Sequence, residues 1–242
     1  AKGITGLSLL ASTLLLVAPH FAMTKVFKNT KLDNMTPLEA VRVQCVGGSS
    51  LSAALTSALL LLNEKPWQAA VMGALPRYLI LVWLLATGPS VGISTAALVP
   101  VYGILTVMFA AMVLPIPFLG PNLAAKIVAS VFIIAGVQCL LSPLSIAQQA
   151  SVAYDEEKQP NDLSILRVQG KADLVNGALL WGLGMGYSST KSIGAACLAW
   201  TLAILVNDIG FQNATTNLGS SMSSVIVELA IALFGSKRLF FS

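Results

Sequence analysis

The segment Pro-Leu-Glu-Ala-Val-Arg-Val-Gln at residues 37–44 has a counterpart, Asp-Leu-Ser-Ile-Leu-Arg-Val-Gln, at residues 162–169. The shared Arg-Val-Gln begins at Arg42 and again at Arg167, an offset of 125 residues. Each copy stands at the start of a long apolar stretch, so the same short sequence begins the same kind of segment twice.

Two further matches lie on either side of this segment. Leu-Val-Ala-Pro at 16–19 corresponds to Leu-Leu-Ser-Pro at 140–143 with an offset of 124, and Lys65 corresponds to Lys191 with an offset of 126. Three matches at nearly one spacing predict a tandem duplication. The predicted repeats are residues 1–120 and 121–242.

The composition is that of a chain embedded in lipid. Of the 242 residues, 56% are hydrophobic and 10% are charged, and the mean hydropathy is +0.81. A soluble domain carries about 25% charged residues, so this chain has too few to cover a surface in water. The 14 basic and 10 acidic residues include no run of Lys or Arg, which excludes nucleic acid as a partner.

The apolar stretches predict an all-α, polytopic integral membrane protein of about eight transmembrane helices. About 20 residues are needed to cross a bilayer core about 30 Å thick. Four helices in each repeat is an even number, so both copies insert with the same orientation and form parallel repeats. The predicted spans are 4–24, 40–62, 67–87, 92–115, 123–145, 164–186, 192–209 and 220–236.

Each repeat resembles the four-helix unit of the DoxX-like membrane family. The resemblance covers most of the chain as topology and a handful of residues as motif: Pro19, Arg42 and Gly47-Gly48 in the first repeat, and Pro143, Arg167 and Gly170 in the second. In that family a Pro closes the first helix and an Arg opens the second beside small residues. Some members are linked to quinol-oxidising respiratory assemblies, so the resemblance implies a small accessory membrane protein.

Ionisable side chains inside a membrane are costly, and each is a candidate functional residue. Glu228 lies near the middle of the last span, and Arg167, Lys171 or Arg77 is its candidate partner. Arg42 is expected to pair with a nearby acid or to reach the headgroups. The candidates for intramembrane ion pairing are Arg42, Arg77, Arg167, Lys171, Asp173 and Glu228.

Other polar residues of the second repeat are interpreted as helix ends. Lys171, Asp173 and Asn176 are expected where the sixth span meets the headgroups, with a polar-lined cavity as the alternative. Asn207 and Asp208 are expected to be solvated at the end of the seventh span, and the aromatic residues, Trp200 among them, to lie in the interface belts.

Five side chains are candidate cofactor ligands. Chlorophyll, carotenoid or lipid is the possible cofactor, and a pigment metal would require an axial ligand or a hydrogen-bonding partner. The alternatives are an interfacial histidine and interhelical hydrogen bonds from the glutamines. With one histidine, and cysteines that match no metal-binding spacing, no metal site is predicted. The candidates are His20, Gln44, Gln138, Gln169 and Glu228.

The main functional hypothesis is a non-catalytic accessory subunit of a large organellar membrane complex, such as a photosystem supercomplex. Its partners would be membrane lipids and other subunits. The short loops and few intramembrane charges favour this role. The chain begins at Ala1 rather than Met, and removal of a leader would favour an organelle, with the thylakoid or the mitochondrial inner membrane as the location.

Two alternatives from other classes stay open. The internal repeat and the midspan Glu228 also suit a small-molecule transporter or channel. A quinone- or lipid-linked membrane enzyme would need Arg167, Lys171, Asp173 and Glu228 to meet in one pocket.

Overall fold

The computed structural model describes residues 2–26, 34–62, 64–96, 98–151, 154–155, 159, 161–210 and 222–241. Within these residues the chain is helical, and its only β contacts are two isolated bridges, Ile93 with Ser151 and Ile116 with Leu119. The α-helices are α1 (Lys2–Val17), α2 (Pro19–Phe21), α3 (Pro37–Leu61), α4 (Pro66–Thr87), α5 (Leu98–Val113), α6 (Pro121–Leu141), α7 (Pro143–Ala150), α8 (Asp162–Gly184), α9 (Ser189–Ile204) and α11 (Met222–Phe241). Short π- or 3₁₀-helical turns are η1 (Ala22–Val26), η3 (Gly88–Val91) and η4 (Leu205–Gly210).

Four helices in the described part of the chain are long and apolar enough to cross a membrane. The prediction of an all-helical chain is confirmed, and these four helices agree with an integral membrane protein. They are Pro37–Leu61, Pro66–Val91, Pro121–Leu141 and Ser189–Ile209.

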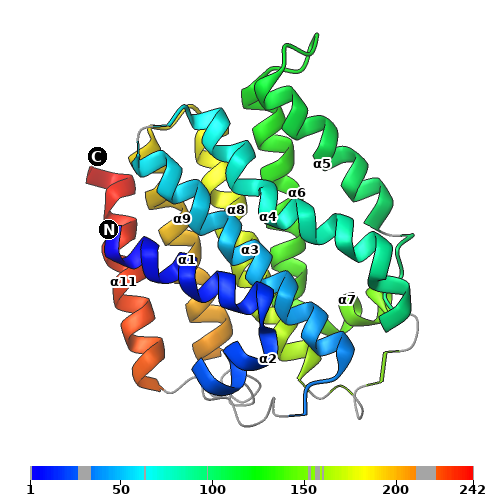
Figure 1. Ribbon diagram of the computed structural model, residues 1–242. Coiled ribbons are helices and arrows are strands. Elements are labelled where there is room, and N and C mark those ends of the chain that lie inside the picture. The colour runs from blue at the N-terminus through cyan, green and yellow to red at the C-terminus, as the bar shows by residue number, and fades with distance from the viewer. Residues whose placement is uncertain are drawn as a thin grey trace.

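Helices α3 and α8 form the centre of the bundle (Figure 1). α3 packs against α1, α4 and α8, and α8 packs against α3, α6 and α9. α8 carries charged residues and is not one of these four helices, but its neighbours cover it on several sides. Large exposed hydrophobic side chains lie mainly on the outer helices, as with Leu7 on α1 (70% exposed) and Leu79 on α4 (61% exposed). Such a belt suits contact with lipid.

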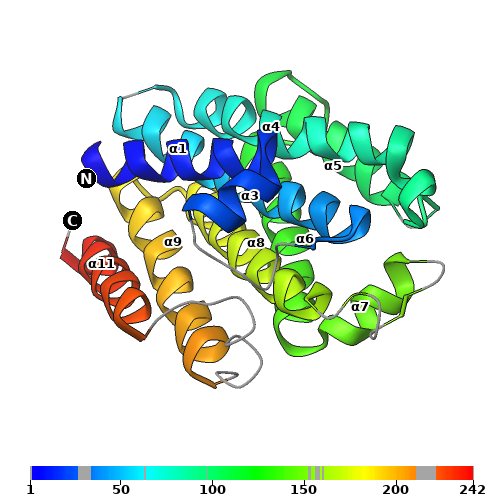
Figure 2. The ribbon, with the colours of Figure 1, turned by 60° about the horizontal axis from the view of Figure 1, so that its bottom comes forward.

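The long helices run up and down alternately. The connections α3–α4, α5–α6 and α8–α9 lie at one end of the bundle, the upper end in Figure 1. α11 packs on α9 at one edge, and α7 lies at the opposite edge (Figure 2).

Two of the predicted continuous spans are broken at corresponding positions. α1 ends before Ala18 (φ −137°, ψ 65°), and α6 ends before Ser142 (φ −136°, ψ 52°). Each of these residues precedes a proline that starts a short helix, α2 or α7. A residue before proline avoids the helical conformation, so the predicted spans 4–24 and 123–145 each contain a helix followed by a bend.

The fourth predicted span also starts too early. The chain turns at Gly92, which has a left-handed φ of 81°, and the bridge from Ile93 to Ser151 follows. α5 therefore begins at Leu98 rather than near residue 92.

Helices α6 and α8 make a close contact, where glycines let the two backbones meet. A Cβ added to Gly170 would stand 2.6 Å from the carbonyl oxygen of Gly136. One added to Gly177 would stand 3.0 Å from the carbonyl oxygen of Ala129, and one on Gly184 3.0 Å from that of Asn122. Glycines seven apart on α8 thus meet backbone carbonyls seven apart on α6, and these contacts fix the register of the two helices.

Candidate functional site

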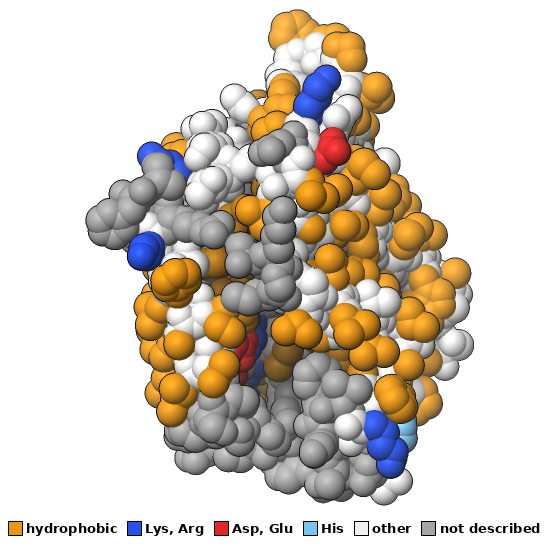
Figure 3. All heavy atoms as spheres, turned by 60° about the vertical axis from the view of Figure 1, so that its left-hand side comes forward, with side chains coloured by type: hydrophobic (Ala, Val, Ile, Leu, Met, Phe, Trp, Pro, Cys, Tyr) orange, Lys and Arg blue, Asp and Glu red, His pale blue; other side chains and the backbone are white. Residues whose placement is uncertain are grey.

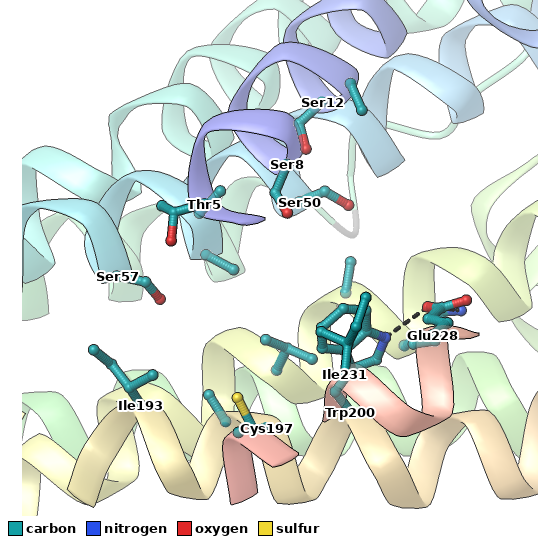
Figure 4. A pocket seen from close by; sticks show the side chains of 18 of the residues that line it. Thr5, Ser8, Ser12, Ser50, Ser57, Ile193, Cys197, Trp200, Glu228 and Ile231 are labelled. Atoms are coloured by element: carbon teal, nitrogen blue, oxygen red, sulfur yellow. Dashed lines mark hydrogen bonds and ion pairs between the residues drawn. The ribbon is translucent and has the colours of Figure 1, made fainter. Parts of the chain in front are cut away.

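A cavity of about 550 Å³ lies between α1, α3, α8, α9 and α11 (Figure 4). One wall carries hydroxyl groups from α1 and α3. Across the gap, the other wall is formed by Ile193, Cys197 and Trp200 of α9 and by Glu228 and Ile231 of α11. The cavity is apolar along most of its length, with Leu61 and Phe234 in its lining, and has a charged end.

The hydroxyl wall has a simple sequence basis. Thr5, Ser8 and Ser12 recur at helical spacing and share one face of α1, and Ser50 and Ser57 lie two turns apart on α3. All five side chains line the cavity.

The charged end consists of Lys171, Trp200, Asp208 and Glu228. Lys171 Nζ lies 2.8 Å from Glu228 Oε1 and 3.1 Å from Asp208 Oδ2. The indole N–H of Trp200 donates to the same Glu228 Oε1 at 2.6 Å. Two carboxylates therefore share one ammonium group, in a place where lysine and aspartate are largely buried.

Local structure brings these four residues together. η4 continues the direction of α9 and carries Asp208 towards α8, while Asn207 Nδ2 donates to Asp208 Oδ1 at 2.6 Å. α11 approaches α9 closely at Gly235, where an added Cβ would stand 2.4 Å from the sulfur of Cys197. This close approach places Glu228 beside Trp200.

A separate central network links α3, α4 and α8. Asp173 accepts hydrogen bonds from Ser49 Oγ (3.0 Å), Gln169 Nε2 (2.9 Å) and Arg77 Nη2 (3.3 Å). Asn176 Nδ2 donates to the carbonyl of Ser49 at 2.8 Å. None of these five residues lines the cavity, so the network holds helices together and does not contact a ligand there.

A third polar cluster joins the starts of α3 and α8. Arg42 forms an ion pair with Asp162, and Glu39 Oε1 accepts from the backbone N–H of Asn161 at 3.1 Å. Glu39 also completes a capping box with Thr36 at the start of α3. Asp162 lies two residues before the predicted sixth span, and burial raises its pKa to about 6, more than Arg42 lowers it.

The structure does not gather the five candidate cofactor ligands. Only Glu228 lines the cavity. Gln44 donates to the carbonyl of Leu16 at 3.2 Å, and Gln169 belongs to the central network. His20 and Gln138 are exposed on the outside of the bundle.

The candidate ion-pairing residues fall into separate groups. Arg42 lies in the third cluster, Arg77 and Asp173 in the central network, and Lys171 and Glu228 at the charged end. Arg167 is partly buried and does not line the cavity.

Several expectations about helix ends are wrong. Lys171, Asp173 and Asn176 lie well inside α8, and the last two are buried. Asn207 is fully buried and Asp208 is 8% exposed, because η4 continues beyond α9 against α8. Trp200 lines the cavity.

Sequence reasoning missed Asp208, Trp200 and the hydroxyl wall. The spacing of Thr5, Ser8 and Ser12 was the available signal for the wall. Asp208 was harder to identify from the sequence, because it lies at the end of an apolar stretch, where an acidic side chain is usually solvated. Among the described residues, no group of three His, Cys, Asp or Glu side chains is placed to hold a metal ion.

No protein-family model, curated protein or solved structure matches this chain. The likeness to the DoxX-like family therefore stays a prediction that rests on the prolines, arginines and glycines of the two repeats.

Proposed function

We propose that this chain is an integral membrane protein that binds a lipid-like amphiphile in its cavity and has no catalytic role of its own. The observation that carries the proposal is the cavity itself, which is mostly apolar, has hydroxyl groups on one wall and is charged at one end. Its volume of about 550 Å³ lies within the range of about 300–1,000 Å³ for small-molecule sites. An amphiphile has the matching shape, with a polar head and an apolar tail.

The surroundings of the cavity favour entry from the bilayer. The helices on its two sides expose large apolar side chains, including Leu7 and Leu10 on α1 and Leu233 and Phe234 on α11. Acidic and basic atoms are visible in a recess bordered by hydrophobic side chains (Figure 3). A ligand that reaches this recess sideways from lipid need not cross water.

We propose further that the fold has eight spans in two parallel four-helix repeats. In support, α3 begins at Pro37 and α8 at Asp162, the same offset of 125 that relates the Arg-Val-Gln copies. The matching bends at Ala18 and Ser142 also support it. α5, with 16 residues, is about 24 Å long, and the uncharged residues 114–119 after it add length.

The distribution of charge favours binding over catalysis. The enzyme alternative needs Arg167, Lys171, Asp173 and Glu228 in one pocket, but only Lys171 and Glu228 line the cavity. Asp173 is bonded within the central network.

Fluorescence quenching tests the proposed cavity. A protein that keeps Trp200 and carries phenylalanine at Trp67, Trp83 and Trp181 is titrated with a detergent brominated on its alkyl chain. We expect saturable quenching, because bromine in the cavity reaches the indole. A matched protein that keeps only Trp83, 37% exposed on α4, reports contact with the outer belt.

A variant that fills the cavity distinguishes quenching inside the cavity from quenching at the exposed apolar surface. Ser57→Phe narrows the cavity, and we expect it to weaken quenching of Trp200 while quenching of Trp83 stays unchanged. If Ser57→Phe leaves the Trp200 titration as it was, the cavity is not a binding site.

A second candidate function is transport, favoured by the position of Glu228 at the end of the cavity. Glu228→Gln should then abolish flux in proteoliposomes while leaving assembly intact. Membership of a large organellar complex, with thylakoid or mitochondrial inner membrane as the location, stays a prediction. Fractionation of the native membrane in mild detergent tests it.

A further inference from the structure

The charged end carries more negative than positive charge. Lys171 is the only cation among the described residues that line the cavity, and it is shared by Glu228 and Asp208. Arg167 lies one turn earlier on α8 but outside the lining. With both acids ionised, the group keeps one uncompensated negative charge, which is costly away from water.

Glu228 directs part of this charge into the cavity. Its two hydrogen bonds, from Lys171 and Trp200, both go to Oε1. Within the described residues Oε2 accepts no hydrogen bond, and the side chain is 31% exposed. A carboxylate oxygen is therefore open to whatever occupies the cavity.

Trp200 adds a second feature that suits a cation. Its indole N–H bonds Glu228, so the ring is held beside the carboxylate and forms part of the cavity wall. An aromatic face next to a carboxylate is a favourable place for an ammonium group, because the ring quadrupole and the negative charge both attract it.

We propose that the cavity selects amphiphiles with a cationic, ammonium-type head, which lies between Glu228 and Trp200 with its tail running towards Leu61 and Phe234. The inference rests on the proposed binding function and adds the class of head group. An anionic head would be repelled by the net negative charge of Glu228 and Asp208, which share one lysine. A neutral head would leave the excess charge uncompensated.

Three probes with the same twelve-carbon chain test the proposal: dodecyltrimethylammonium, dodecanol and laurate. Each is titrated below its micellar concentration into the protein that keeps only Trp200, in a mild non-ionic detergent, with indole fluorescence as the readout. We expect dodecyltrimethylammonium to bind about tenfold more tightly than dodecanol, which corresponds to about 1.4 kcal/mol. Laurate should bind most weakly.

Two variants assign the preference to charge. Glu228→Gln should bring the ammonium and alcohol affinities together. Asp208→Asn should reduce the preference without touching the ligand, because Asp208 does not line the cavity. Both variants should still bind dodecanol, which shows that the cavity has formed. Ser50→Ala, a lining hydroxyl without charge, is the matched control and should keep the full preference.

The possible failures are distinguishable. If the unsubstituted protein binds all three probes equally, or prefers laurate, the head-group proposal is overturned while the binding function stands. If none of the probes gives saturable binding, the binding function itself fails.

Discussion

Arg77 Nη2 on α4 lies 3.3 Å from Asp173 Oδ2 on α8, and this ion pair ties two helices that both pack against α3. Asp173 is 2% exposed, so its charge depends on Arg77 and on the hydrogen bonds from Ser49 and Gln169. A buried charge that loses its partner is far more costly than a pair removed together.

Arg77→Gln and Asp173→Asn should each destabilise the protein by about 3 kcal/mol or more, and the double variant by clearly less than the sum. The measurement is a double-mutant cycle on the free energy of unfolding in mixed micelles. Glu64→Gln, at an exposed acid in the α3–α4 turn, should change little. Strict additivity of the two single variants would show that the pair is not coupled.

Gly170→Ala should destabilise the protein by about 1–3 kcal/mol, because its new Cβ would meet the backbone of α6. Gly103→Ala, on the exposed side of α5 with open space around it, should be neutral or stabilising by up to about 1 kcal/mol. Thermal unfolding of the two variants in detergent compares them directly. If the two variants unfold at the same temperature, α6 and α8 are not in backbone contact.

The raised pKa of Asp162 predicts a pH dependence of stability. A carboxyl that binds its proton more tightly in the folded state stabilises the fold below the unfolded pKa of about 4. That contribution is lost as pH rises through about 6, with a total of about 3 kcal/mol. Asp162→Asn does not titrate, so the stability of the unsubstituted protein relative to this variant should fall between pH 4 and pH 7. A stability difference between the two proteins that does not change with pH would contradict the raised pKa of Asp162.

Cysteine accessibility tests the eight-span topology. With Cys45, Cys139 and Cys197 replaced by serine, single cysteines at Lys65 and Pro117 are labelled in sealed vesicles with an impermeant maleimide. Eight spans place both on the same side of the membrane. If only α3, α4, α6 and α9 cross the membrane, the two sites label from opposite sides.

The positions of the helices were predictable because each apolar run is bounded by residues that stop helices. The second predicted span ends at residue 62 and the third begins at 67, which agrees with α3 ending at Leu61 and α4 beginning at Pro66. The bends at Ala18 and Ser142 were not predicted, since a proline near the end of an apolar run can lie within a helix or break it. The central position of α8 results from its packing against neighbouring helices, and the hydropathy of a sequence does not show which helices pack together.

The charged end was predictable only in part. A carboxylate in the middle of an apolar span marked Glu228 as unusual, but choosing among Arg77, Arg167 and Lys171 required the rotation of each helix about its axis. That rotation is set by contacts such as Gly170 on Gly136, which bring together residues far apart in sequence. The position of Asp208 beside Lys171 depends on the π-helical turn η4, which no pattern in the sequence indicates.

Helix α5 packs against α6, and this contact between the two proposed repeats has a consequence for how such a molecule evolves. If the halves are repeats, the counterpart of that contact is the gap between α1 and α11, where the described residues form no comparable interface. In a homodimer of one four-helix unit, symmetry would make these two places between the units identical. A fused chain is free of that constraint. The α5–α6 side can then be a closed structural contact, while the α1–α11 side acquires the acids and the aromatic ring of the proposed binding site.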